Sequence, residues 1–132
     1  MFLSAKFEWF CKSSVVSYKK IIGSEKMPVT IKRKSNYLYA FLKGEIDHHT
    51  APEIRESIDD ALSSSEQCNF LVIDFSDVTF MDSSGVGLVM GRYRYAVTLG
   101  KKVRVDNLDD RNYKIMQMSG IPKIAEINRK EN

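Results

Sequence analysis

The sequence predicts an α/β fold, with a mixed four- to five-stranded sheet and helices packed on it. Three observations predict it. Short apolar segments of strand length recur along the chain, stretches with apolar residues every three or four positions separate them, and Gly, Ser, Asn and Asp mark the boundaries. The 132 residues suffice for one hydrophobic core and are too few for two.

Residues 1–26 differ from the rest, and we expect them to be an N-terminal amphipathic extension to a domain over 27–132. The extension has five lysines and two glutamates, whereas the remaining residues balance 15 basic against 15 acidic side chains. Its apolar residues recur at helical steps: Leu3, Phe7, Cys11, Val15, Tyr18 and Ile22. This pattern predicts a helix docked on the domain or a frayed terminus, with a membrane-surface or partner-binding helix as the alternative.

Two strands are expected at the start of the domain. Residues 29–34 alternate apolar and basic side chains, as an edge strand does, and residues 37–42 are apolar on both faces. Ser35 and Asn36 suit the turn between them.

The first helix of the domain is predicted just after residue 50. Thr50 and Glu53 have the spacing of a capping box, in which each side chain bonds the other's backbone. The apolar face of this helix comprises Ile54, Ile58, Ala61 and Leu62.

A central strand and a second helix follow. Residues 70–73 form a continuous apolar run, typical of a strand covered on both sides. The helix is expected from the turn at 83–85 to about Leu99, with Gly100 ending it. Its expected core face is Val86, Val89, Met90, Tyr93 and Val97.

The C-terminal third predicts one more helix between two strands. Residues 102–105 form the first strand, Asp109 or Asp110 caps a short helix ending near Gly120, and residues 124–127 form the last strand.

Composition argues against several classes of function. The uncharged balance of residues 27–132 disfavours nucleic-acid binding, which needs clustered Lys and Arg. No apolar run approaches the length of a membrane span, so we expect no stable membrane association. Cys11 and Cys68 cannot build a disulfide framework and the N-terminus is a poor secretory signal, which together indicate a cytoplasmic protein.

The run Asp82-Ser83-Ser84-Gly85 is the strongest candidate site, because the electrostatics of a helix start tolerate an added phosphate. One helix face continues from Ser84 and suits a docking strip, with burial of Leu88 under a neighbouring loop as the alternative. Its members are Leu88, Gly91 and Tyr95, with Arg92 beside them.

Other chemistries have weaker support. Asp74, Asp77 and Asp82, placed by the pattern at the exit of the central strand and in the loop after it, could hold a divalent cation, but such residues commonly shape turns and caps. A nucleophilic serine would need His48 or His49 as a base, and nothing in the sequence brings either to the serines. We expect no catalytic residue, no metal and no cofactor.

Four segments carry a family resemblance: Gly44-Glu45-Ile46-Asp47-His48-His49-Thr50, the run from Asp74 to Gly87, Gly91-Arg92-Tyr93, and Met118-Ser119-Gly120-Ile121. With them the chain resembles the anti-sigma factor antagonists, the single-domain branch of the sulphate transporter and anti-sigma factor antagonist (STAS) fold, and most closely the sporulation member.

The resemblance implies a regulatory protein rather than an enzyme. An anti-sigma factor that is also a serine kinase would phosphorylate Ser84, the unphosphorylated form would bind that kinase and free the sigma factor, and a phosphatase would reset the switch. The resemblance and the helix face from Ser84 together give the expected partner-binding residues: Asp47, His48, His49, Asp82, Ser83, Ser84, Leu88, Gly91, Arg92 and Tyr95. The alternatives are a STAS scaffold subunit of a stress-signalling complex and a small nucleotide-binding protein or enzyme.

The sequence departs from the family at both ends. The family usually closes with a helix, whereas only five polar or charged residues follow Ile127. We therefore expect the N-terminal extension to form a helix over the surface that the closing helix would cover.

Overall fold

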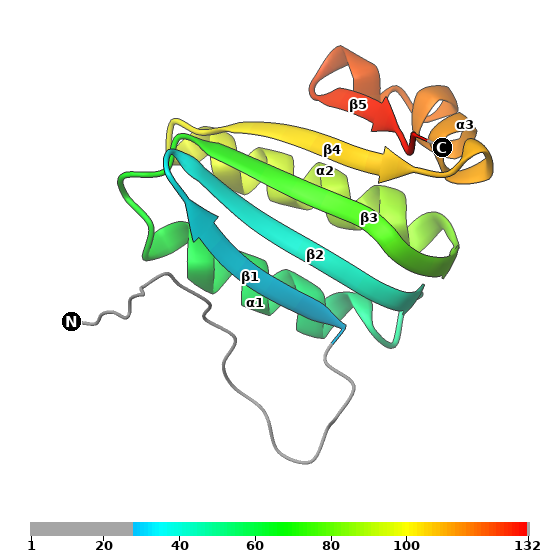
Figure 1. Cartoon of the computed structure of the whole chain (residues 1–132), viewed down its shortest axis with the longest axis horizontal. Coiled ribbons are helices and arrows are strands. Elements are labelled where there is room, and N and C mark those ends of the chain that lie inside the picture. The colour runs from blue at the N-terminus through cyan, green and yellow to red at the C-terminus, as the bar shows by residue number, and fades with distance from the viewer. Residues whose placement is uncertain (1–27, 132) are drawn as a thin grey trace.

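The computed structural model describes residues 28–131, which form a two-layer domain with a five-stranded sheet (Figure 1). The extension expected over residues 1–26 lies outside the described residues. In chain order the elements are β1 (Val29–Lys34), β2 (Tyr37–Ile46), α1 (Ala51–Ser63), β3 (Phe70–Met81), α2 (Ser83–Thr98), β4 (Lys102–Leu108), α3 (Asp110–Met118), the 3-10 turn η1 (Ile121–Lys123) and β5 (Glu126–Arg129).

The strands lie in the sheet in their order along the chain. β1 pairs antiparallel with β2, and every later pair is parallel. The prediction of a mixed sheet is thus confirmed. Ser35, in the tight turn between β1 and β2, has a φ of 59°, a conformation that few residues other than glycine adopt readily.

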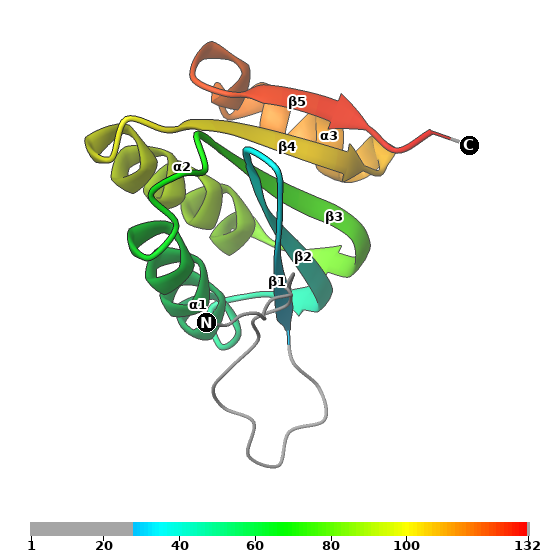
Figure 2. The same ribbon diagram turned by 60° about the vertical axis from the view of Figure 1, so that its left-hand side comes forward.

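The helices of the described region pack on one face of the sheet. Figure 2 shows α1 and α2 side by side there. Ile58 of α1, Val89 of α2 and Met116 of α3 are fully buried in one core with Ile73 of β3. Each strand therefore turns alternate side chains toward the helices.

Several expected boundaries were wrong. β2 runs to Ile46 rather than to residue 42, and β4 runs to Leu108 rather than to residue 105. β3 continues to Met81, so Asp74 and Asp77 lie within a strand and not in a loop after it. β5 begins at Glu126 rather than 124, because the chain first makes the 3-10 turn, in which the amides of Ile124 and Ala125 both donate to the carbonyl of Ile121.

Gly85 is required by a close approach inside the core. A Cβ at this position would lie 2.3 Å from the Cγ and Sδ of Met81, whose side chain is fully buried. The first turn of α2 thus lies directly against the end of β3.

We expect Gly85→Ala to lower the free energy of unfolding by about 1–3 kcal/mol, because the new methyl overpacks the Met81 site. Urea denaturation measures this. Gly87→Ala is the matched control, since a Cβ there meets nothing within 4 Å, and it should be neutral or stabilising. Equal effects of both substitutions would contradict this account.

Candidate functional site

The start of α2 presents Ser84 at the positive end of the helix. Asp82 is the N-cap, and its Oδ1 accepts a hydrogen bond from the Ser84 amide at 2.7 Å. Ser83 is exposed and Ser84 is half-buried. Asp82 therefore shapes the turn that presents the two serines.

The loop after β2 is organised by Asp47. Its Oδ1 accepts hydrogen bonds from the amides of His49 at 2.9 Å and Thr50 at 3.1 Å. These bonds favour the charged carboxylate and hold the pKa of Asp47 below its ordinary value of 3.8. Asp47 is thus ionised at neutral pH.

The capping box expected at Thr50 is wrong. The Thr50 hydroxyl accepts a hydrogen bond from the Asp47 amide at 3.1 Å and donates to the Glu45 carbonyl at 2.9 Å, and it makes no cap bond to α1. The Thr50 backbone is helical, and its hydroxyl stabilises the loop that precedes it and does not cap α1.

The sheet register brings this loop and the serines to the same edge. Ile46 and Met81 are partners where β2 and β3 end, and the Asp82 amide donates to the Ile46 carbonyl at 3.2 Å. His48 and His49 follow in the loop, both exposed, with ring centroids 4.1 Å apart. The site thus lies at the carboxyl ends of two parallel strands, where α/β folds commonly place their sites.

The exposed strip expected along α2 is only partly present. Leu88 and Arg92 are 4% and 6% exposed, so the docking-strip interpretation was wrong for both, and Leu88 is buried as the alternative predicted. α1 packs against α2, and its Asp59 lies 2.8 Å from Arg92, Oδ1 to Nε. Gly91 and Tyr95 are half-buried and reach the surface.

Val97, expected in the core, is 50% exposed. It lies in the last turn of α2, and Ala96 is the buried residue there instead. The buried arc of α2 is therefore rotated toward α1 relative to the predicted one.

A hollow of about 180 Å³ separates the starts of α1 and α2, and its lining residues are Ala51, Arg55, Gly87, Leu88, Gly91 and Arg92. The space beside Gly87 and Gly91 is empty, because a Cβ at either position would have no neighbouring atom within 4 Å. The absence of side chains at these two glycines therefore contributes to the hollow.

Asp74 of β3 and Asp82 of the following turn each make their own hydrogen bonds and do not form one cluster. Asp74 accepts hydrogen bonds from the Ser76 amide and hydroxyl and from Asn107 Nδ2, at 2.6–2.8 Å. Asp82 serves as the N-cap described above. Among residues 28–131, no three His, Cys, Asp or Glu side chains are grouped so that they could hold a metal ion.

Sequence reasoning missed Phe80 as a surface residue of this region. It pairs with Glu45 at the end of β3, is 44% exposed, and has the guanidinium of Arg111 at 5.3 Å from its ring centroid. The only local signal was an aromatic residue in a segment that the sequence placed in a loop.

Residues 28–132 match the family described as the STAS domain. The chain belongs to the STAS domain family. In residues 28–131 no helix is long and apolar enough to span a bilayer.

Two similar proteins are named as anti-sigma factor antagonists. The anti-sigma F factor antagonist of Paenibacillus polymyxa is 32% identical over 101 residues, which are 76% of this chain and 86% of that protein. The anti-sigma-B factor antagonist of Bacillus subtilis strain 168 is 30% identical over 102 residues, 77% of this chain and 91% of that one.

The solved structures of the anti-sigma factor antagonist SpoIIAA are also similar. The unphosphorylated form has a TM-score of 0.61 at 26% identity, covering 79% of this chain and 89% of that one. The phosphorylated form, from Bacillus, has a TM-score of 0.60 at 29% identity, covering 75% and 89%.

The Asp59–Arg92 pair should stabilise the helix packing only as a pair. Burial raises the pKa of Asp59 and lowers that of Arg92, so in both residues the loss of hydration outweighs the attraction between them. Because the Asp59 side chain keeps 31% exposure, we expect Asp59→Ala to cost about 2 kcal/mol, less than a fully buried pair.

The double variant Asp59→Leu with Arg92→Leu should recover most of that loss, since no charge is then left unpaired. Urea denaturation of Asp59→Leu, Arg92→Leu and the double variant measures the coupling energy between the two side chains. If the losses of unfolding free energy in the two single variants added up to the loss in the double variant, the pairing would be contradicted.

The Asp47 loop should loosen only in acid. Because the folded pKa lies below 3.8, the stabilisation by the carboxylate is complete above the unfolded pKa and is lost as the pH falls through the folded one. The amide resonances of His49 and Thr50 should therefore titrate with a midpoint below 3.8. Asp47→Ala should abolish that titration. A midpoint above 3.8 in the unsubstituted protein would contradict the lowered pKa of Asp47.

Proposed function

We propose that this protein is an anti-sigma factor antagonist that works by partner exchange. Unphosphorylated, it binds an anti-sigma factor that is also a serine kinase and so releases the sigma factor. Phosphorylation of Ser84 by that kinase ends the binding, and a serine phosphatase restores it. The names of the relatives and the two solved phosphorylation states of SpoIIAA support this proposal.

The observation that carries the proposal is the position of Ser84. It is the second residue of α2, two positions after the N-cap Asp82, and it is half-buried. A phosphate there carries a charge of about −1.5 to −2 and meets the positive end of the helix dipole. The domain itself can therefore accept the modification without refolding.

The effect of the phosphate then falls on the partner. Asp82 already uses its carboxylate on the Ser84 amide, and the ionised Asp47 lies in the loop at the same sheet edge. A phosphate would add a third negative group beside these two carboxylates. At a partner surface that fits a neutral hydroxyl, the phosphate would be repelled by nearby negative charge and would lose its hydration without compensation. Binding would be weakened without any loss of fold.

We propose that the contact surface comprises Asp47, His48, His49, Asp82, Ser83, Ser84, Gly91 and Tyr95. Leu88 and Arg92 are buried, and they contribute to this surface only by lining the hollow between α1 and α2. The protein itself performs no catalysis and acts in the cytoplasm, where sigma factors and their kinases work.

The test uses the full chain with a candidate anti-sigma factor kinase, ATP and magnesium. Ser84→Ala should gain no phosphate and still bind the kinase. Ser84→Asp should bind at least about tenfold more weakly, a change of 1.4 kcal/mol. Mass spectrometry and titration calorimetry measure both.

Ser83→Ala is the matched control and should still gain one phosphate. Phosphate on Ser83 in the Ser84→Ala protein would refute the assignment of the site. Self-assembly without a heterodimer would favour the scaffold subunit, and nucleotide turnover without the kinase would favour an enzyme.

A further inference from the structure

The sheet face opposite the helices carries a row of stacked aromatic rings. Tyr37, Tyr39 and Phe41 alternate along β2 with the buried core residues, and Phe70 of β3 stands beside Tyr37. The ring centroids are 4.8 Å apart for Tyr37 and Phe70, 6.0 Å for Tyr37 and Tyr39, and 5.7 Å for Tyr39 and Phe41. We call these four residues the aromatic ladder.

The aromatic ladder is a partly covered apolar layer. Val72 pairs with Tyr39 on this face, away from the helix-side core, and is fully buried. The four rings themselves are only half-buried. Figure 1 looks onto this face, and no helix or strand of the described residues crosses it.

Cations line the ladder. Lys32 lies 5.6 Å from the ring centroid of Phe41, and Arg104 lies 5.6 Å from that of Tyr37. An open sheet with aromatic and basic side chains also suits single-stranded nucleic acid, in which bases stack on exposed ring faces. Here the ring faces are turned toward one another at interplanar angles of 12–26°, which leaves mainly their edges for a ligand.

The chain itself supplies an apolar segment at one end of the ladder. Residues 1–27 enter the domain through Pro28 at the start of β1, where Val29 pairs with Leu42, the neighbour of Phe41. A helix running back from this point would follow β1 and β2 from Phe41 toward Tyr37. Twenty helical residues extend about 30 Å, whereas the four steps from Phe41 to Tyr37 extend about 13 Å.

We propose that residues 3–22 dock as an amphipathic helix on the aromatic ladder, with their apolar stripe toward the rings. The stripe consists of Leu3, Phe7, Cys11, Val15, Tyr18 and Ile22. The lysines of the segment lie largely off this stripe and stay in water. Because the segment is tethered beside the ladder, even a weak interaction is favoured by a high effective concentration.

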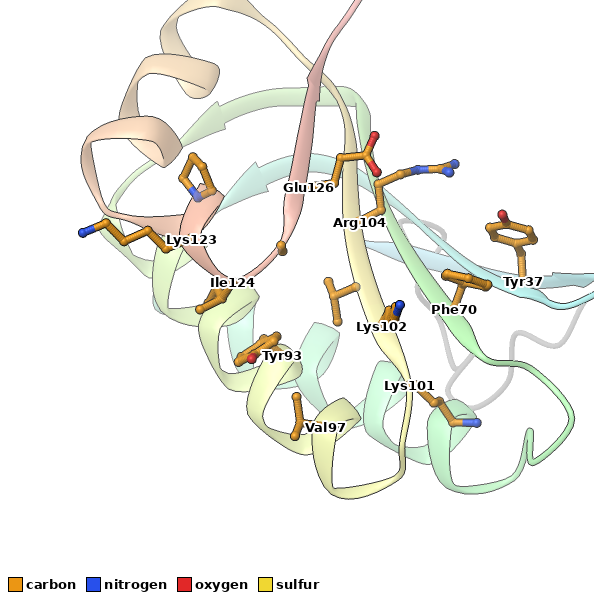
Figure 3. Close-up of a pocket in the computed structure, with 13 residues that line it drawn as sticks. Tyr37, Phe70, Tyr93, Val97, Lys101, Lys102, Arg104, Lys123, Ile124 and Glu126 are labelled. Carbon is orange, nitrogen blue, oxygen red and sulfur yellow. The ribbon is translucent and has the colours of Figure 1, made fainter.

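A second apolar surface is less suited to this segment. A hollow of about 590 Å³ lies between α2, β4 and η1, and Figure 3 shows Tyr93, Val97 and Ile124 on its walls. Tyr37 and Phe70 of the aromatic ladder also line this hollow, but its walls at β4 and η1 lie farther from β1 in the strand order than the ladder does.

Cys11 reports directly on docking, because it lies on the stripe and the chain has one other cysteine. Cys68 is fully buried, and burial raises the pKa of its thiol, so it reacts with a thiol reagent only when the domain opens. The experiment measures the labelling rates of both thiols in the full chain by peptide mass spectrometry. We expect Cys11 to react severalfold more slowly than in the urea-unfolded protein.

Tyr39→Ser should raise the Cys11 rate severalfold, whereas Tyr93→Ser, a matched half-buried tyrosine in the other hollow, should not. The Cys68 rate shows whether either variant opens the domain. Tyr18→Ser tests the same contact from the segment and leaves the domain unchanged. Its control is Trp9→Ser, which removes an aromatic residue from the opposite side of the helix.

Three results would overturn the proposal. Release of Cys11 by Tyr93→Ser but not by Tyr39→Ser would place the segment in the other hollow. Protection that fades on dilution would assign the ladder to a second copy of the chain. A Cys11 rate equal to that of the unfolded protein would show that the segment is not docked.

Discussion

The parallel hydrogen bonding of β3 to both β2 and β4 is the constraint on which the rest of the domain depends. Because β2 and β3 run the same way and end together, the loop that holds Asp47 and the helix start that holds Ser84 meet at one edge of the sheet. The bond from the Asp82 amide to the Ile46 carbonyl joins the two segments directly. The candidate site is thus a consequence of strand register, and its residues need no direct contact with one another to act on one partner.

α2 separates what must stay packed from what must change. Its buried side, with Gly85 against Met81 and Arg92 against Asp59, holds the helix to the sheet and to α1. In its first turn Ser83 is exposed, Ser84 is half-buried, and the Asp82 carboxylate caps the Ser84 amide. A charge added at Ser84 therefore changes the electrostatic surface at the helix start while the packed side keeps its contacts. This arrangement suits a protein whose modification must alter binding and preserve folding.

The two faces of the sheet are covered by different means. Helices cover one face with aliphatic side chains, and on the other the aromatic ladder covers Val72 by stacking within the sheet. The buried Lys101 ammonium is paired, because it donates to the carbonyls of Ser65, at 2.8 Å, and Cys68. The ladder thus remains an apolar surface within a polar rim, which is why it suits a further segment better than it suits bulk water.

Local periodicity and turn chemistry predict the order and type of the elements. The edge strand β1, the start of α2 after Asp82 and its end before Gly100 follow from them. The turn and the family resemblance also point to Ser84. Which side of α2 is buried depends on packing, because α1 lies beside it and covers Leu88 and Arg92, which the helical pattern assigned to a docking strip. The same holds for Thr50, whose hydroxyl bonds back to the strand end at Glu45. Such choices depend on neighbours distant in sequence, and no local pattern encodes them.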